Sequence, residues 1–157
     1  AVIMKICSLI KQNNIVLGLE PGKKEDVLRK FVTILAERGL IDHSQDLLNK
    51  IMERERLGST ALDQEIAIPH ALSSHIEKTF LALAVLDKEV DFGTDESKPV
   101  SILFLLLGNK GNPGQQLKVL AHICRLIKET NVIKMIKKAK SIQEICEKID
   151  EAESEIV

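Results

Sequence analysis

One histidine, His70, follows a short apolar run and a proline within the segment ERERLGSTALDQEIAIPHALSSH, residues 53–75. A neutral imidazole is a nucleophile at physiological pH, because its ordinary pKa is about 6.5, and a backbone carbonyl can hold its second ring nitrogen. Attack on a phosphoryl group would form a phosphoramidate, which can pass the group onward. Such transfer depends mostly on positioning and on donors for the phosphoryl oxygens. Arg54, Ser59 and Thr60 lie just upstream and are candidate donors.

A structural role is the alternative for these side chains. An isolated histidine at a strand end is often a hydrogen-bonded structural residue, and an arginine in the last turn of a helix, such as Arg54, is often a solvated charge. We interpret His43, His75 and His122 as structural, because they lie beside a helix start, in a polar loop and on a helix flank. No HxxxH or HxH spacing occurs, so the sequence predicts no metal site and disfavours a metal-dependent hydrolase.

His70 is expected at the exit of a strand. Residues 66–68, 80–86 and 100–107 are short apolar runs rich in β-formers and bounded by turn residues, which predicts three strands. Pro69 cannot donate to a sheet ladder, so it should end the pairing of the first run and leave His70 beside the sheet. Ligands of open α/β sheets bind at such places. The run at 100–107 is apolar at almost every position, which is typical of a central strand.

Helical periodicity surrounds these strands along the chain. Apolar residues recur at helical spacing over residues 24–38 and again from Ser44 to the charged turn at 53–56. Ahead of them, residues 6–10 suggest a short helix and residues 15–19 a short strand.

The C-terminal third is expected to be helical. One helix should begin with Asn112 as its cap, Pro113 in its first turn and Gln115 at its third position. Its inward face is expected to carry Leu117, Leu120, Ala121, Cys124 and Ile127. Two more helices are predicted over 132–139 and 141–152, the second capped by Ser141. The fold class is therefore α/β, with residues 1–157 in a single layered domain.

Composition limits the classes of partner. Lys and Arg (22) nearly cancel Asp and Glu (23), so the net charge of −1 offers no field to attract nucleic acid or anionic lipid. Only 3% of the residues are aromatic, with no Trp or Tyr to stack on bases. The longest apolar run, 102–107, is far below the roughly 20 residues that cross a bilayer, and the N-terminus lacks a signal-peptide layout. We expect no nucleic-acid partner, no membrane insertion and a cytoplasmic location.

The cysteines do not suggest a disulfide or zinc framework. Cys7, Cys124 and Cys146 are widely spaced, odd in number and in no CxxC pair, so reduced thiols are expected. Cys124 and Cys146 are interpreted as small buried apolar residues, because each falls on an apolar helical stripe.

Two motifs together carry a family resemblance. RERLGST, residues 54–60, followed by IAIPHA, residues 66–71, resembles the phosphoryl-acceptor segment of enzyme IIA domains of the bacterial sugar phosphotransferase system, fructose and mannitol class. The resemblance covers nearly the whole chain, including the strand PVSILFLLL at 99–107, and is closest to the stand-alone nitrogen-regulatory form. It implies a mixed sheet flanked by helices.

The resemblance also implies roles for individual residues. His70 matches the phosphorylated histidine, Arg54 the arginine that helps to hold the phosphoryl group, and Ser59 and Thr60 its neighbouring hydroxyls. The implied intermediate is a covalent phosphohistidine, which needs no cofactor. A histidine-containing phosphocarrier protein would load it, and a IIB domain or a regulatory target would receive the signal.

Two departures from the family pattern bear on activity. A glycine-containing turn is usual after the Ser-Thr pair, but ALDQE at residues 61–65 lacks glycine and should be stiffer. A second histidine is usual before a leucine at the start of the later helix, where this chain has Gln116. His122 cannot replace it, because six helical residues rotate a side chain by about 240°. The Gln116 amide can still donate to an oxyanion or to His70.

Two functions therefore compete. A phosphocarrier that accepts a phosphoryl group on His70 is favoured by intact Arg54, Ser59 and Thr60. A IIA-like binding module with reduced or lost transfer is favoured by Gln116 and by the missing glycine.

Overall fold

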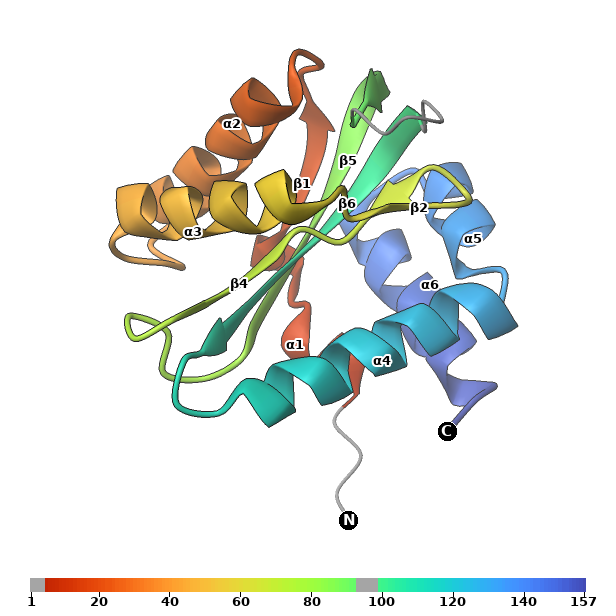
Figure 1. Ribbon diagram of the computed structural model, residues 1–157. Coiled ribbons are helices and arrows are strands. Elements are labelled where there is room, and N and C mark those ends of the chain that lie inside the picture. Colours follow the sequence, from red (N-terminus) through yellow and green to blue (C-terminus); the bar gives the residue numbers. More distant parts are fainter. Residues whose placement is uncertain (1–4, 93–98) are drawn as a thin grey trace.

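The structure, a computed structural model, describes residues 5–92 and 99–157. Within these ranges the chain forms a mixed six-stranded sheet with helices on both faces, as predicted (Figure 1). The helices are α1 (Ile6–Leu9), α2 (Lys24–Glu37), α3 (Ser44–Leu57), α4 (Pro113–Glu129), α5 (Val132–Lys138) and α6 (Ile142–Ser154), with a 3-10 turn η1 (Gln12–Asn14). The strands are β1 (Ile15–Leu19), β2 (Ala61–Leu62), β3 (Ile66–Ala67), β4 (His70–Ser73), β5 (Phe80–Asp91) and β6 (Pro99–Asn109). No helix in the described part of the chain is long and apolar enough to cross a membrane.

The strand β6 is central, as its continuous apolar sequence predicted. The sheet order is β1-β5-β6-β3-β2, and β4 also pairs with β6. β5 runs antiparallel to β6, whereas β3 and β4 run parallel to it one after the other along the same edge. Because β6 contacts both neighbours along its length, it fixes the position of β4 relative to the rest of the sheet.

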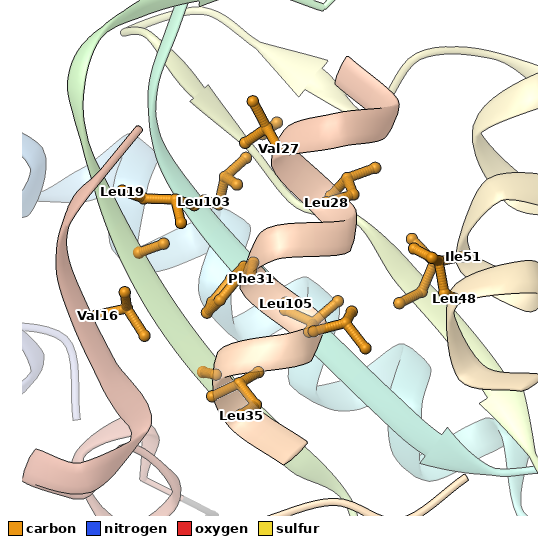
Figure 2. Packing of buried hydrophobic residues seen from close by; sticks show 14 of the residues in the cluster. Val16, Leu19, Val27, Leu28, Phe31, Leu35, Leu48, Ile51, Leu103 and Leu105 are labelled. Carbon is orange, nitrogen blue, oxygen red and sulfur yellow. The ribbon is translucent and has the colours of Figure 1, made fainter. Parts of the chain in front are cut away.

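Side chains of β6 alternate between two apolar cores. Leu103 and Leu105 belong to the core beneath α2 and α3, and Figure 2 shows them next to Phe31 of α2. Ile102 and Phe104 point to the opposite core, which α1, α4, α5 and α6 cover. This period of two is the reason that a strand apolar at every position can lie between two helical layers.

The helix α2 illustrates how local signals and packing agree. Its buried positions recur at helical spacing and pack on the sheet and on α3 (Figure 2). After the helix, Gly39 adopts a φ of 73°, a left-handed conformation that glycine reaches without a Cβ clash. The predicted helix and its glycine stop are confirmed.

The inward face predicted for α4 is only partly confirmed, because Ile127 is buried and Leu120 packs against the core, whereas Leu117, Ala121 and Cys124 are exposed. The buried side chains are those of Gln116, Val119, Ile123, Leu126 and Ile127, whereas Leu117 is 66% exposed and Cys124 is exposed. The helix is thus rotated by one residue, about 100°, from the expected orientation. The predicted cap also differs, because Asn112 stands at the N-cap position but its side chain makes no capping hydrogen bond.

The expected position of His70 also needs correction. Pairing with β6 does not stop at Pro69, since His70 is the first residue of β4 and lies opposite Leu106. Proline lacks a donor but keeps its carbonyl, which accepts a hydrogen bond from the Leu106 N–H at 3.0 Å. Because β6 has 11 residues and extends beyond β3, the chain can resume pairing after a two-residue break.

Candidate functional site

Three of the five residues singled out in the sequence line one open pocket. His70, Arg54 and Gln116 come from β4, α3 and α4, and the pocket has a volume of about 570 Å³. Its other lining residues are Lys50, Glu53, Arg56, Leu57, Ala71 and Leu72. Elements far apart in the sequence therefore bring a nucleophile, a cation and an amide to one place.

The imidazole of His70 is held in one tautomer by the segment that connects β3 to β4. Its Nδ1 lies 2.7 Å from the carbonyl oxygen of Ile68. A carbonyl can only accept a hydrogen bond, so Nδ1 carries the proton and Nε2 keeps the lone pair. The side chain is half-buried and borders the pocket. The ring is thus oriented to use Nε2 as a nucleophile or as a hydrogen-bond acceptor.

The helix α3 presents one face to this pocket. Lys50, Glu53, Arg54 and Leu57 follow the i, i+3, i+4, i+7 spacing that places side chains on one side of a helix. Arg54 lies in the last turn, and its guanidinium donates to the carbonyl of Gly58 at 2.8 Å. A guanidinium has five N–H donors, so this bond leaves others for the oxygens of an anion. Arg54 is therefore positioned by its own helix end.

Ser59 and Thr60 do not line the pocket. The Thr60 hydroxyl donates to the buried carboxylate of Glu55, which also accepts from the Thr60 backbone N–H at 3.3 Å and pairs with Lys24 at 2.5 Å. The Ser59 hydroxyl oxygen accepts from the Ala61 N–H at 3.1 Å. In this arrangement both hydroxyls brace the turn that joins α3 to β2.

The ALDQE segment forms a tight hairpin between β2 and β3. Gln64 and Glu65 have positive φ angles of 70° and 64°. Non-glycine residues are uncommon in this conformation. The Glu65 carbonyl accepts the N–H groups of Ser101 and Ile102, so β6 holds the turn in place.

Gln116 ties α4 to the strand that carries His70. Its Nε2 donates to the carbonyl of Ala71 at 2.6 Å, and the side chain is only 7% exposed. The close approach depends on Gly108 of β6, because a Cβ there would lie 3.0 Å from the Cβ of Gln116 and 3.1 Å from Leu72 Cδ2. An amide with two N–H donors can hold Ala71 with one and offer the other to the pocket.

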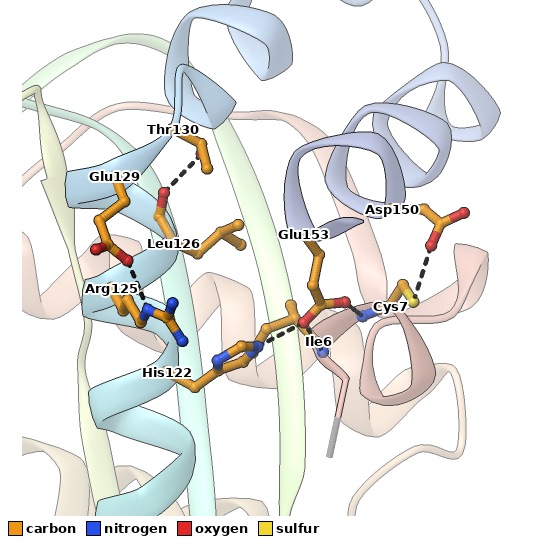
Figure 3. Close-up of polar contacts among 9 residues, drawn as sticks. All are labelled: Ile6, Cys7, His122, Arg125, Leu126, Glu129, Thr130, Asp150 and Glu153. Carbon is orange, nitrogen blue, oxygen red and sulfur yellow. Dashed lines mark hydrogen bonds and ion pairs between the residues drawn. The ribbon is translucent and has the colours of Figure 1, made fainter. Parts of the chain in front are cut away.

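The other histidines lie outside this pocket. His122 Nε2 is 2.7 Å from the carboxylate of Glu153, which also accepts the backbone N–H of Ile6 at 2.6 Å (Figure 3). His43 and His75 stack on each other with ring centroids 3.8 Å apart. No cluster able to hold a metal ion occurs within residues 5–92 and 99–157. These positions agree with the structural roles predicted for the three histidines.

The described thiols are all free and form no disulfide. Burial, and then hydrogen bonding to Glu153 and Asp150, raises the pKa of the Cys7 thiol to about 11 (Figure 3). Partial desolvation of the sulfur also raises the pKa of Cys124, although the residue as a whole is exposed, and that of Cys146, which is half-buried and not fully buried as predicted. These shifts favour the protonated, unreactive thiol, so none of the cysteines is a nucleophile candidate.

Six of the nine pocket residues were not predicted as part of a site: Lys50, Glu53, Arg56, Leu57, Ala71 and Leu72. The helical spacing of Lys50 and Leu57 with Arg54 was a usable signal for one face of α3. Nothing in the sequence showed that this face lies against β4, because β4 itself was not predicted.

Comparison with known proteins gives consistent matches. The family model described as "Phosphoenolpyruvate-dependent sugar phosphotransferase system, EIIA 2" matches residues 8–152. A nitrogen regulatory protein from Bradyrhizobium diazoefficiens is 31% identical, over 90% of this chain and 92% of the relative. The crystal structure of nitrogen regulatory protein IIA-Ntr from Neisseria meningitidis has a TM-score of 0.82 and 27% identity, covering 92% of this chain and 98% of that one.

A more distant structure shares the fold. The complex of enzyme IIA mannitol with phosphorylated enzyme IIB mannitol from Escherichia coli matches with a TM-score of 0.74 and 22% identity. The match covers 91% of this chain and 99% of that chain.

Proposed function

Because the chain belongs to the EIIA 2 family of the phosphoenolpyruvate-dependent sugar phosphotransferase system, we propose that it is a phosphocarrier with a regulatory role. His70 accepts a phosphoryl group from a histidine-containing phosphocarrier protein and holds it as phosphohistidine. The observation that carries this proposal is the 2.7 Å contact between His70 Nδ1 and the Ile68 carbonyl, which leaves the Nε2 lone pair for attack.

The transfer balances without water or a cofactor. The Nε2 lone pair forms a bond to phosphorus while the P–N bond to the donor imidazole breaks, and the donor nitrogen keeps that electron pair. A donor ring protonated at its second nitrogen leaves as neutral imidazole, and the ring of His70 takes over the positive charge. The Nδ1–H stays hydrogen-bonded to Ile68 throughout. Arg54 and the second Gln116 N–H stabilise the charge on the phosphoryl oxygens.

The acceptor downstream is a IIB domain or a regulatory target protein. The Escherichia coli complex of IIA mannitol with phosphorylated IIB supports the first class of partner, and the nitrogen regulatory relatives support the second. The free thiols are consistent with a cytoplasmic setting for this exchange.

A binding module with reduced transfer is the second candidate. It is favoured by Gln116, whose amide already donates to Ala71 and which cannot carry the positive charge of an imidazolium. In that case the fold would act on partners without cycling a phosphoryl group.

The intact mass of the protein separates the two candidates. We expect incubation with phosphoenolpyruvate, its phosphotransferase enzyme and a phosphocarrier protein to add one phosphate that is labile to acid and stable to alkali. His70→Ala should abolish the gain, whereas the matched variant His75→Ala should retain it. An unchanged mass of the wild-type protein would favour the binding module, and a phosphate that persists in His70→Ala would refute the site.

A further inference from the structure

A buried ion pair joins α2 to α3 at an unfavourable place for both charges. Lys24 is the first residue of α2 and Glu55 lies in the last turn of α3, with the two charged groups 2.5 Å apart and the side chains 20% and 1% exposed. The helix dipole favours anions at the start of a helix and cations at its end, so each residue carries the disfavoured charge. A buried ion pair also rarely stabilises a protein more than apolar side chains would. Stability alone therefore does not account for this pair.

The surroundings of Glu55 match an ionised carboxylate. It accepts the hydroxyl of Thr60, the backbone N–H of Thr60 at 3.3 Å and the ammonium of Lys24. An ionised carboxylate only accepts hydrogen bonds, so all three groups suit it. Lys24 is held in turn by Phe92, whose carbonyl accepts from its Nζ at 3.4 Å and whose ring centroid lies 5.1 Å away. The ion pair thus fixes Thr60 without lining the His70 pocket.

The α3–β2 turn, residues 58–60, connects this ion pair to the residues of the proposed reaction. The Thr60 carbonyl accepts the N–H of Ile68 at 3.1 Å, and the Ile68 carbonyl is the group that orients Nδ1 of His70. At the other end of the turn, the Gly58 carbonyl accepts from the Arg54 guanidinium at 2.8 Å. One short turn therefore carries the acceptors that orient Arg54 directly and His70 through Ile68.

We propose that Lys24 and Glu55 are positioning residues for phosphoryl transfer, because their ion pair holds the α3–β2 turn and the turn orients Arg54 and His70. The inference rests on the proposed function and adds to it two residues that lie outside the pocket. Without Lys24, the carboxylate loses the charge that keeps it buried against Thr60, so the turn shifts and both orientations loosen. A misplacement of about 1 Å can cost up to about 10²-fold in rate.

A purely structural link between α2 and α3 is the alternative. Such a link would lower the free energy of unfolding when it is broken, but it would leave the orientation of His70 unchanged in the folded protein. The two explanations therefore differ in the reactivity and the tautomer of His70, measured under conditions where circular dichroism shows every variant to be folded.

The first measurement is the rate at which phosphoramidate, a small donor that phosphorylates imidazoles without a protein partner, labels His70. We expect Lys24→Met to slow this labelling about tenfold. Lys24→Arg should stay within about twofold of the wild type, because a guanidinium also pairs with a carboxylate. Lys30→Met is the matched control, since it removes a lysine of α2 whose pair with Glu20 is exposed, and it should leave the rate unchanged.

The second measurement follows the two routes from the turn. In the Arg54→Ala background the effect of Lys24→Met should shrink from about tenfold to about threefold, because one of the two routes is already lost. The ¹⁵N shifts of His70 should show protonated Nδ1 alone in the wild type and a mixture of tautomers in Lys24→Met.

A double variant removes the risk that Lys24→Met fails to fold. Lys24→Met/Glu55→Gln leaves no unpaired buried charge, and it should label about as slowly as Lys24→Met. It carries the same test with a more stable protein.

Several results would overturn the positioning role. Wild-type labelling rates in folded Lys24→Met or in the double variant, with a lower free energy of unfolding, would leave the pair a structural link. Equal slowing by Lys24→Met and Lys24→Arg, or by Lys30→Met, would show that the charge of Lys24 is not the cause. An undiminished effect in Arg54→Ala together with a single His70 tautomer in Lys24→Met would exclude both routes. Failure of phosphoramidate to label His70 in the wild type would count against the proposed function itself, and with it this inference.

Discussion

At the scale of single residues, the chemistry depends on which nitrogen of His70 is free. The sequence predicted the nucleophile from the IPHA motif and its upstream arginine, and it also anticipated that a carbonyl could hold the ring. The identity of that carbonyl, Ile68, follows only from the path of the chain around Pro69. The structural roles of Ser59 and Thr60 were harder to predict from the sequence. They depend on the burial of Glu55, a charged residue on an otherwise solvated helix end.

Arg54 should contribute to transfer through charge and geometry. We expect Arg54→Ala to slow phosphoryl transfer to His70 about tenfold or more, the loss of a charge-assisted contact of about 1.4 kcal/mol. Arg54→Lys should recover only part of the rate, since a point charge cannot reproduce the guanidinium fork. Single-turnover rates measure both effects. Transfer as fast in the alanine variant as in the wild type would make Arg54 a solvated charge.

Substitution of Gln116 tests whether the lack of a second histidine, which the family resemblance implies at this position, limits the rate of phosphoryl transfer. Gln116→His should accelerate transfer about tenfold, because a charge-assisted hydrogen bond would replace a neutral one. The gain should be larger at pH 6 than at pH 8, since only the protonated imidazole adds charge, with an ordinary pKa of about 6.5. Gln115→His is the control, because it introduces the same side chain at the neighbouring position, which does not line the pocket. A gain that does not depend on pH would contradict the electrostatic explanation.

At the scale of elements, two local patterns were ambiguous. α4 carries aliphatic side chains on adjacent faces, so periodicity alone could not choose between burying Leu117 and burying Gln116. Gln116 is the buried residue because its amide donates to the Ala71 carbonyl of β4. The sequence did not reveal this strand. The turn after α3 was likewise expected to present two hydroxyls to the phosphoryl group, but Glu55 holds Thr60 instead.

The Glu55–Thr60 contact predicts a stability effect. Thr60→Val keeps the side-chain shape and leaves the buried Glu55 carboxylate without one donor, so it should lower the free energy of unfolding by about 1–3 kcal/mol. Urea denaturation measures the loss, with Ser59→Ala as the control on the partly exposed neighbour. If Thr60→Val instead abolished transfer with unchanged stability, its hydroxyl would serve the phosphoryl group, as the family resemblance implied.

At the scale of the molecule, the layered α/β architecture and the central strand were predictable from the alternation of apolar runs. The contact between α6 near the C-terminal end and α1 near the N-terminal end of the described chain was not predictable. Glu153 of α6 accepts the N–H groups of Ile6 and Cys7 and contacts His122 of α4, all through one buried carboxylate (Figure 3). Because its partners are 31 to 147 residues away, no local pattern could reveal it.

This carboxylate should matter for stability more than for transfer. Glu153→Gln replaces an acceptor oxygen by an N–H₂ group facing donors, so we expect a loss of about 1–3 kcal/mol in the free energy of unfolding. Thermal and urea unfolding measure it. Glu151→Gln, which removes an exposed charge paired with Lys148, should change stability by less than about 0.5 kcal/mol. Equal losses of unfolding free energy in the two variants would show that the buried contacts of Glu153 do not stabilise the protein.

The position of the phosphoryl group on the imidazole decides whether His70 reacts through Nε2. We would label the imidazole nitrogens with ¹⁵N, charge the protein with a phosphocarrier and phosphoenolpyruvate, and assign the phosphorylated nitrogen by ¹⁵N and ³¹P NMR. We expect phosphorus on Nε2 of His70, with Nδ1 still protonated and hydrogen-bonded to Ile68. Phosphorus on Nδ1 of His70, or on any other histidine, would contradict it.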